Sequence, residues 1–250
     1  MRYAIYYTAP ADSPLTRLGA AWLGRDAVDG KALPQPEIPG LTVEDLATLT
    51  ADPRRYGFHG TLKAPFSLAA GADEQALRVA FRSFCSHAAL FTIPGLSVTR
   101  LGRFLALTPQ PASADLNGFA AACVEAFEPF RAPLSEADMA RRLAANLSPS
   151  QQELLQVWGY PYVFEEFRFH MTLSGKLEED STMSALEAAA MDHFAGVTDR
   201  PHQIASLGLF AEPERGAPFR AVEILPLTGS TGPQDPNLRQ IPVSAGSPRQ

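Results

Sequence analysis

Two short segments of the sequence are nearly identical, and both contain residue types that can do acid–base chemistry. Phe58–Leu62 reads Phe-His-Gly-Thr-Leu, and Phe169–Leu173 reads Phe-His-Met-Thr-Leu. An imidazole has an ordinary pKa of about 6.5, so it can accept or donate a proton near neutral pH. The matching surroundings of His59 and His170 therefore indicate a site in which one imidazole takes up a proton while the other gives one.

Each segment is expected to be a strand that presents its polar side chains on one face. Residues two apart in a strand lie on the same face, so His59, Thr61 and Lys63 should point together, with Leu62 pointing the other way. The second segment gives a similar polar face, made up of Arg168, His170 and Thr172. Two such strands side by side would line a cleft with two imidazoles, two hydroxyls and two cations.

That combination of side chains suits displacement at the phosphorus of a phosphodiester. One imidazole can take a proton from the attacking oxygen while the other protonates the leaving oxygen on the opposite side. Threonine hydroxyls can bind the non-bridging oxygens, and cations can neutralise the charge that develops in the transition state. We expect no metal and no cofactor, because the sequence has no His-Glu-x-x-His, no Cys/His grouping with zinc spacing and no glycine-rich phosphate loop.

The elements that must position these residues follow a mixed α+β pattern. Strands are predicted at about 1–8, 58–68, 96–101, 104–107, 167–177, 204–211 and 219–227. Helices are predicted at about 14–23, 42–50, 73–89, 114–130, from 134, 147–158 and 181–194.

The order of these elements contains an internal repeat. Each histidine strand is followed by an acidic linker, an alanine-rich amphipathic helix and then two strands, near 58–108 and again near 167–227. We therefore expect a duplicated two-lobe fold of antiparallel sheets flanked by helices, with the active-site cleft between the lobes. Residues 1–228 should form one domain with a helical insertion at 113–158. Residues 229–250 lack apolar periodicity and are expected to be a disordered tail.

The two segments resemble the His-x-Thr motifs of the 2H phosphoesterase superfamily, which includes RNA 2′,3′-cyclic phosphodiesterases. The longer runs Arg54–Phe66 and Trp158–Leu173 resemble the branch encoded with carbon–phosphorus lyase genes of phosphonate metabolism. The resemblance covers roughly residues 1–228. It implies that the two histidines are catalytic and that Thr61 and Thr172 bind phosphate. It also implies a small ribosyl cyclic phosphate with a further phosphate as substrate.

Several other residues are candidates for binding that substrate. Two arginine pairs, Arg54-Arg55 and Arg141-Arg142, are candidate holders of the second phosphate, although such pairs are most often solvated. Tyr160 and Tyr162 are candidate substrate contacts and are explained equally well as core or rim aromatics.

The lysine, the other histidines and the cysteines can also be explained by purely structural roles. Lys63 can equally be a solvated lysine at a strand end. His87, His193 and His202 fit ordinary structural positions. The only two cysteines, Cys85 and Cys123, fit core thiols in a reducing compartment.

Net charge and the lengths of the apolar stretches limit which partners the protein can bind. The formal net charge of -6 argues against a protein that holds long nucleic acid along its backbone, and it leaves room for a small phosphorylated substrate. No apolar stretch is long enough to span a bilayer, and the N-terminus lacks a signal-peptide apolar region, so we expect a cytoplasmic protein without membrane contact. No feature of the sequence indicates an oligomeric state.

Three functions are consistent with these observations. The first is a metal-independent phosphodiesterase that opens a small cyclic phosphodiester. The second is an RNA 2′,3′-cyclic phosphodiesterase, against which the acidic net charge weighs. The third is a non-catalytic module that binds a phosphate or nucleotide ligand in the same cleft.

Overall fold

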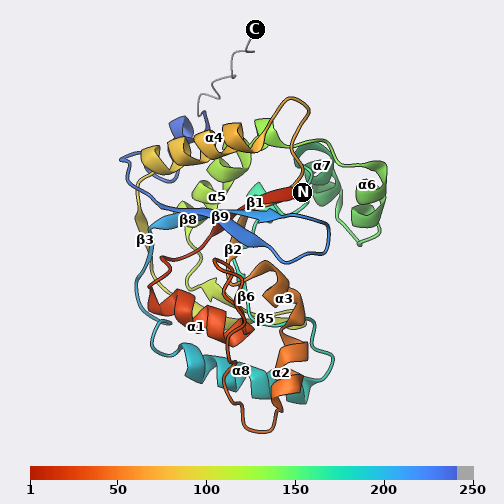
Figure 1. The fold of residues 1–250 in the computed structure, drawn as a ribbon, viewed down its shortest axis with the longest axis vertical. Coiled ribbons are helices and arrows are strands. Elements are labelled where there is room, and N and C mark those ends of the chain that lie inside the picture. Colours follow the sequence, from red (N-terminus) through yellow and green to blue (C-terminus); the bar gives the residue numbers. More distant parts are fainter. Residues whose placement is uncertain (241–250) are drawn as a thin grey trace.

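The computed structural model describes residues 1–240, and it has the α+β architecture predicted from the sequence (Figure 1). A seven-stranded antiparallel sheet has the order β4-β5-β6-β2-β1-β8-β9, and β3 pairs with β7 in a separate two-stranded sheet. The strands are β1 (Arg2–Tyr7), β2 (Gly60–Phe66), β3 (Phe91–Ile93), β4 (Leu96–Leu101), β5 (Phe104–Pro109), β6 (Met171–Thr172), β7 (His202–Ile204), β8 (Ser206–Glu212) and β9 (Arg220–Pro226).

Helices pack around this sheet. Helix α4 packs against β8 and β9, and α8 packs against β4 and β5, so each helix covers strands from the other repeat. In Figure 1, α4 and α5 lie at the top of the view, α1 and α8 lie at the bottom, and the strands lie between them. The helices are α1 (Pro14–Leu23), α2 (Val43–Leu49), α3 (Ala51–Tyr56), α4 (Glu74–His87), α5 (Ala114–Ala126), α6 (Glu136–Leu143), α7 (Pro149–Trp158) and α8 (Asp180–Phe194).

Side-chain caps fix where several helices begin. The Ser13 hydroxyl accepts a hydrogen bond from the Thr16 amide at 3.1 Å, and Pro14 occupies the first helical position of α1. Ser148 and Gln151 form a reciprocal capping box at the start of α7. These are local signals, which explains why the sequence predicts these helix starts correctly.

The sheet order shows how the repeat is arranged in space. The series β2-α4-β3-β4 recurs as β6-α8-β7-β8, and the two histidine strands β2 and β6 are neighbours at the centre of the sheet. On its other edge β6 pairs with β5, and on its other edge β2 pairs with the N-terminal strand β1. The first strand of the chain therefore completes the half of the sheet that contains β8 and β9.

Four elements differ from the prediction, and one of them is β7, which is a strand separate from β8 and pairs with β3. Strand β6 has only two residues, because a short 3₁₀ turn at Phe164–Glu166 precedes it and only Gly60, Ala106 and Leu107 face it in the ladder. Helix α3 and strand β3 are also present, and both are too short to show a hydrophobic period.

The packed part of the chain extends beyond residue 228. The Gly229 amide donates to the Ala88 carbonyl at 2.9 Å, and Leu238 is buried in the main core. The short 3₁₀ helix η3 (Pro236–Arg239) lies against α5. The remaining part of the expected tail, residues 241–250, lies outside the described residues. Among the described helices, none is both long and apolar enough to cross a membrane.

A candidate active site formed by two histidines and an arginine wall

The two histidines predicted from the sequence line one cleft. Thr61 lies in β2 and Thr172 in β6, and His59 and His170 each lie one residue before these strands. All four side chains line a cavity of about 520 Å³. The neighbouring positions of β2 and β6 in the sheet bring them together, as Gly60 lies opposite Met171 in the strand pair.

The two imidazoles are held in the same way. His59 Nδ1 lies 2.8 Å from the carbonyl oxygen of Gly57, and His170 Nδ1 lies 2.8 Å from the carbonyl oxygen of Arg168. A carbonyl can only accept, so Nδ1 must be the protonated nitrogen in both rings. In each ring, Nε2 is therefore the nitrogen that is left for chemistry. The Thr61 hydroxyl lies 3.0 Å from His59 Nε2.

His59 is the more enclosed of the two imidazoles. Its ring stacks on the Tyr6 ring with the centroids 3.8 Å apart. Burial lowers the pKa of His59 to about 4; the hydrogen bond to Gly57 opposes this shift and the charge of His170 adds to it. His59 is therefore neutral at pH 7, with a lone pair on Nε2, which is the state that a general base requires.

His170 lies where the cleft meets an apolar pocket of about 400 Å³. The Phe104 ring lies 5.8 Å from the His170 ring, centroid to centroid. Arg168 and Tyr162 line this apolar pocket rather than the cleft, whereas Tyr160 lines both. The structure thus places Tyr160 in the wall of the cleft, and it places Arg168 and Tyr162 in the apolar pocket, which the cleft meets at His170.

The prediction that Lys63 shares a face with Thr61 is wrong. Thr61 lies opposite Tyr6 in β1, but Lys63 lies opposite Ile5, so β2 has one extra residue between the two positions. Such a bulge reverses the alternation of faces. Lys63 consequently points toward α5, with 4% of its surface exposed and Nζ 2.8 Å from both the Val124 carbonyl and Glu128 Oε2.

Arginines form one wall of the cleft. Five of them line it: Arg2, Arg55, Arg141, Arg142 and Arg215. Three belong to the pairs singled out in the sequence, but Arg54 of those pairs points inward, where its Nε donates to the Leu23 carbonyl at 2.6 Å. Among residues 1–240, no carboxylate lines the cleft itself.

Two carboxylates behind this wall hold four of its arginines. Glu212 is fully buried and lies 2.5 Å from Arg2 Nε and 2.8 Å from Arg55 Nη1. Burial raises the pKa of Glu212, but hydrogen bonds from Arg2 and the Gly216 amide, with the charges of Arg2 and Arg55, outweigh this effect and hold the pKa below its usual value. Asp138 similarly pairs with Arg141 at 2.8 Å and with Arg215 at 2.6 Å.

Sequence reasoning missed two contributors on the first strand, Arg2 and Tyr6. They lie four residues apart in β1 and so share a face, and that face is the one beside Thr61. The alternation was visible in the sequence, but only the pairing of β1 with β2 shows that this face borders the histidines. Within residues 1–240 no group of three or more His, Cys, Asp or Glu side chains is arranged to hold a metal ion.

Comparison with known proteins places the chain in a family. A family described as "Protein of unknown function (DUF1045)" matches residues 61–220, which is more than half of the chain. The chain belongs to this family. The match includes both threonines of the cleft and His170.

Two relatives of the DUF1045 chain bear the name "Ribose 1,5-bisphosphate phosphokinase PhnN". The one from Janthinobacterium sp. (strain Marseille) is 41% identical over 231 residues, which is 91% of this chain and 51% of the relative. The one from Laribacter hongkongensis (strain HLHK9) is 39% identical over 233 residues, which is 92% of this chain and 53% of the relative. The chain therefore spans about half the length of these relatives. The names agree with the phosphonate-metabolism branch that the sequence resembles.

A more distant match is a solved structure titled "Crystal structure of phosphoesterase". It covers 91% of this chain and 98% of its own, with 11% identity and a TM-score of 0.35. A likeness at this level bears on neither the fold nor the chemistry.

Proposed function

We propose that this protein is a phosphodiesterase that opens a small cyclic phosphodiester by paired-histidine acid–base catalysis. The observation that carries the proposal is the matched hydrogen bonding of His59 and His170, which leaves Nε2 of both rings for chemistry in one cleft. The arginine wall supports an anionic substrate, because it lines the same cavity.

The burial of His59 supports an assignment of roles within the pair. His59 is neutral at pH 7, so its Nε2 takes a proton from a water molecule as the water oxygen attacks phosphorus. The ring P–O bond breaks, and the departing oxygen takes a proton from protonated His170. The product is a phosphomonoester, and the two imidazoles return to their starting states by exchanging protons with solvent.

Thr61 and Thr172 are proposed to hydrogen-bond the non-bridging phosphate oxygens, since both line the cleft two residues after a histidine. The substrate is proposed to be a ribosyl cyclic phosphate. The relatives named for ribose 1,5-bisphosphate support a phosphorylated ribose as the substrate class. The kinase activity in their name is that of proteins about twice as long as the matching segment.

A substitution series tests the proposal. We expect His59→Ala and His170→Ala each to lower kcat on a ribose cyclic phosphate by about 10²- to 10⁴-fold. His87→Ala is the matched control, because His87 lies on the exposed side of α4, away from the cleft. Near-normal kcat in either cleft variant would show that the two imidazoles do not act as an acid–base pair.

Two further measurements separate the alternatives. Activity should persist in EDTA, and a loss that added metal reverses would contradict the paired-histidine mechanism. RNA with a 2′,3′-cyclic end should be a poor substrate beside the sugar phosphate. If neither compound is turned over and the double variant His59→Ala/His170→Ala still binds one of them tightly, the protein is a binding module instead.

A further inference from the structure

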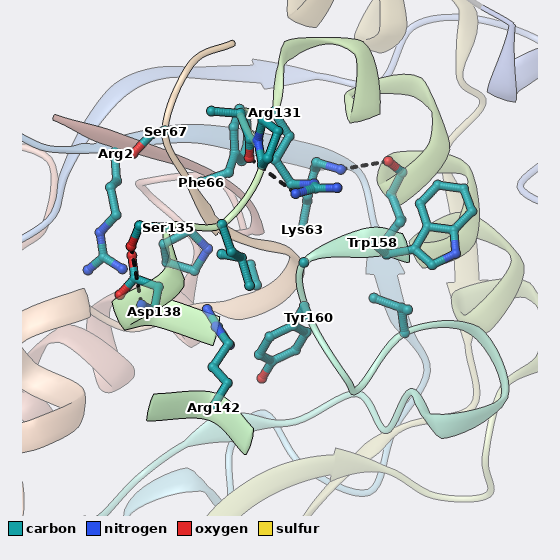
Figure 2. A pocket seen from close by; sticks show the side chains of 18 of the residues that line it. Arg2, Lys63, Phe66, Ser67, Arg131, Ser135, Asp138, Arg142, Trp158 and Tyr160 are labelled. Carbon is teal, nitrogen blue, oxygen red and sulfur yellow. Dashed lines mark hydrogen bonds between the residues drawn. The ribbon is translucent and has the colours of Figure 1, made fainter. Parts of the chain in front are cut away.

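A small, enclosed basic pocket adjoins the histidine cleft. Its volume is about 140 Å³, and it shares Arg2, Arg142 and Tyr160 with the cleft. Figure 2 shows Arg2, Arg142 and Tyr160 around this space, with Lys63 and Arg131 on its far side. The cations on the far side are already paired, since Lys63 and Arg131 both bond Glu128.

Arg142 is the cation of this pocket that has no carboxylate bonded to it in the described chain. It lies on α6 and is half-buried, and its Nε is buried without a hydrogen-bond partner in the described residues. Its guanidinium lies over the Tyr160 ring, with the carbon 5.2 Å from the ring centroid. A buried N–H without a partner is costly, so a ligand that accepts a hydrogen bond would relieve this cost.

The charges of the arginines that line the cleft exceed what one phosphodiester can balance. Five arginines line the cleft, and two carboxylates, Glu212 and Asp138, pair with four of them. The surplus is three positive charges, and a cyclic phosphodiester has one negative charge. A phosphomonoester supplies up to two more at neutral pH, because its second pKa is about 6.

Asp138 also lines the basic pocket, where it would repel an anion. Its Oδ1 is bonded to Arg141 and its Oδ2 to Arg215, so each oxygen already faces a cation. Those hydrogen bonds and charges, acting against a smaller effect of burial, hold the pKa of Asp138 below its usual value. The anion would therefore meet the guanidinium groups of Arg142 and Arg2 rather than an unpaired carboxylate.

We propose that the enclosed pocket binds a phosphomonoester group that the substrate carries in addition to its cyclic phosphodiester, and that Arg142 determines this specificity. The inference rests on the proposed function, because it places the cyclic phosphodiester between His59 and His170. Since Arg142 and Tyr160 line both spaces, one sugar-sized molecule can reach from one to the other. Guanidinium groups suit this task, as their paired N–H donors match phosphate oxygens.

A matched pair of substrates tests the inference by turnover. The probes are a ribose cyclic phosphate with a phosphate on its primary hydroxyl and the same compound without that phosphate. The wild type should have the higher kcat/KM for the phosphorylated compound. Arg142→Gln should lower that preference by about 10- to 100-fold, whereas Arg142→Lys should restore part of it.

Controls exclude general effects of the substitution. Arg200→Gln removes an exposed arginine that lines none of the cleft, the basic pocket or the apolar pocket, and it should keep the wild-type preference. Thermal unfolding verifies that each variant is folded. An equal loss of kcat/KM on both compounds in Arg142→Gln, or no preference in the wild type, would overturn the inference.

Binding of ribose 5-phosphate separates this inference from the proposed function, because that compound has a phosphomonoester and no diester. Calorimetry should show binding to the wild type and at least about tenfold weaker binding to Arg142→Gln. If that difference appears although no cyclic compound is turned over, the subsite stands and the phosphodiesterase proposal fails. If turnover depends on both histidines but ribose 5-phosphate binds both proteins equally, the subsite is refuted.

Discussion

The Tyr6 ring stacks on the His59 ring with the centroids 3.8 Å apart, and this contact joins the first strand of the chain to the candidate base. Tyr6 is fully buried, and its hydroxyl has no hydrogen-bond partner in the described residues. The ring excludes water from one side of the imidazole, consistent with the burial that lowers the pKa of His59. The N-terminal strand therefore affects the protonation of a residue more than fifty positions away.

The Tyr6 hydroxyl should cost stability in the free protein. We expect Tyr6→Phe to raise the free energy of unfolding by about 1 kcal/mol, because it removes an unsatisfied buried hydroxyl. Tyr7→Phe is the matched control on the same strand, since the Tyr7 hydroxyl lies 2.5 Å from His202 Nε2. That change should lower stability by about 1 kcal/mol. Urea unfolding of both variants measures the contrast, and equal losses would show that the Tyr6 hydroxyl has a partner.

The pH dependence of activity should reflect the low pKa of His59. A base must be neutral to accept a proton, and kcat/KM reports groups of the free enzyme. We expect the acid limb of kcat/KM to lie near pH 4, well below the ordinary histidine value, because burial lowers the pKa of His59 to about 4. NMR titration of the ring signal that disappears in His59→Gln identifies the group. A signal that titrates near 6.5 would contradict the burial of His59.

Lys63 should matter for stability rather than for chemistry in the histidine cleft. We expect Lys63→Met to destabilise the protein by about 2 kcal/mol, because it removes one member of a buried ion pair while Arg131 still contacts Glu128. Thr61→Val is the contrast, and it should lower kcat/KM by about tenfold with little change in stability. Denaturant unfolding and kinetics on both variants separate the two roles. A larger loss of kcat/KM in Lys63→Met than in Thr61→Val would contradict the bulge.

Glu212 should anchor the arginine wall. We expect Glu212→Gln to cost about 3 kcal/mol, because it leaves the charges of Arg2 and Arg55 without their buried partner. Glu187→Gln is the control, since Glu187 pairs with Arg100 at the surface and should change stability by less than about 1 kcal/mol.

The pH dependence of stability tests the same carboxylate. The pKa of Glu212 is lower in the folded than in the unfolded protein, so its stabilisation is fully present above the ordinary value of 4.5 and is lost as the pH falls through the folded value. The wild type should therefore lose more stability than Glu212→Gln as the pH falls below about 4.5. Parallel curves for the two proteins would contradict this role of Glu212.

The sequence alone identifies the features that depend on local pattern. The His-x-Thr repeat, the capped helices α1 and α7, and the α+β order are read from spacing and residue type, because turns, caps and periodicity act over a few residues. The presence of His59 and His170 in one cleft followed from the repeat. The repeat also located most of the strand–helix–strand units correctly.

Tertiary structure decided which polar residues meet the histidines. A one-residue bulge in β2 turns Lys63 into the core, and its register with β1 is invisible in a single strand. Arg2, Tyr6, Arg142 and Arg215 reach the cleft from β1, α6 and the β8–β9 loop, which are distant in sequence. Such contacts depend on strand pairing and helix packing across the whole chain, so local residue patterns cannot specify them.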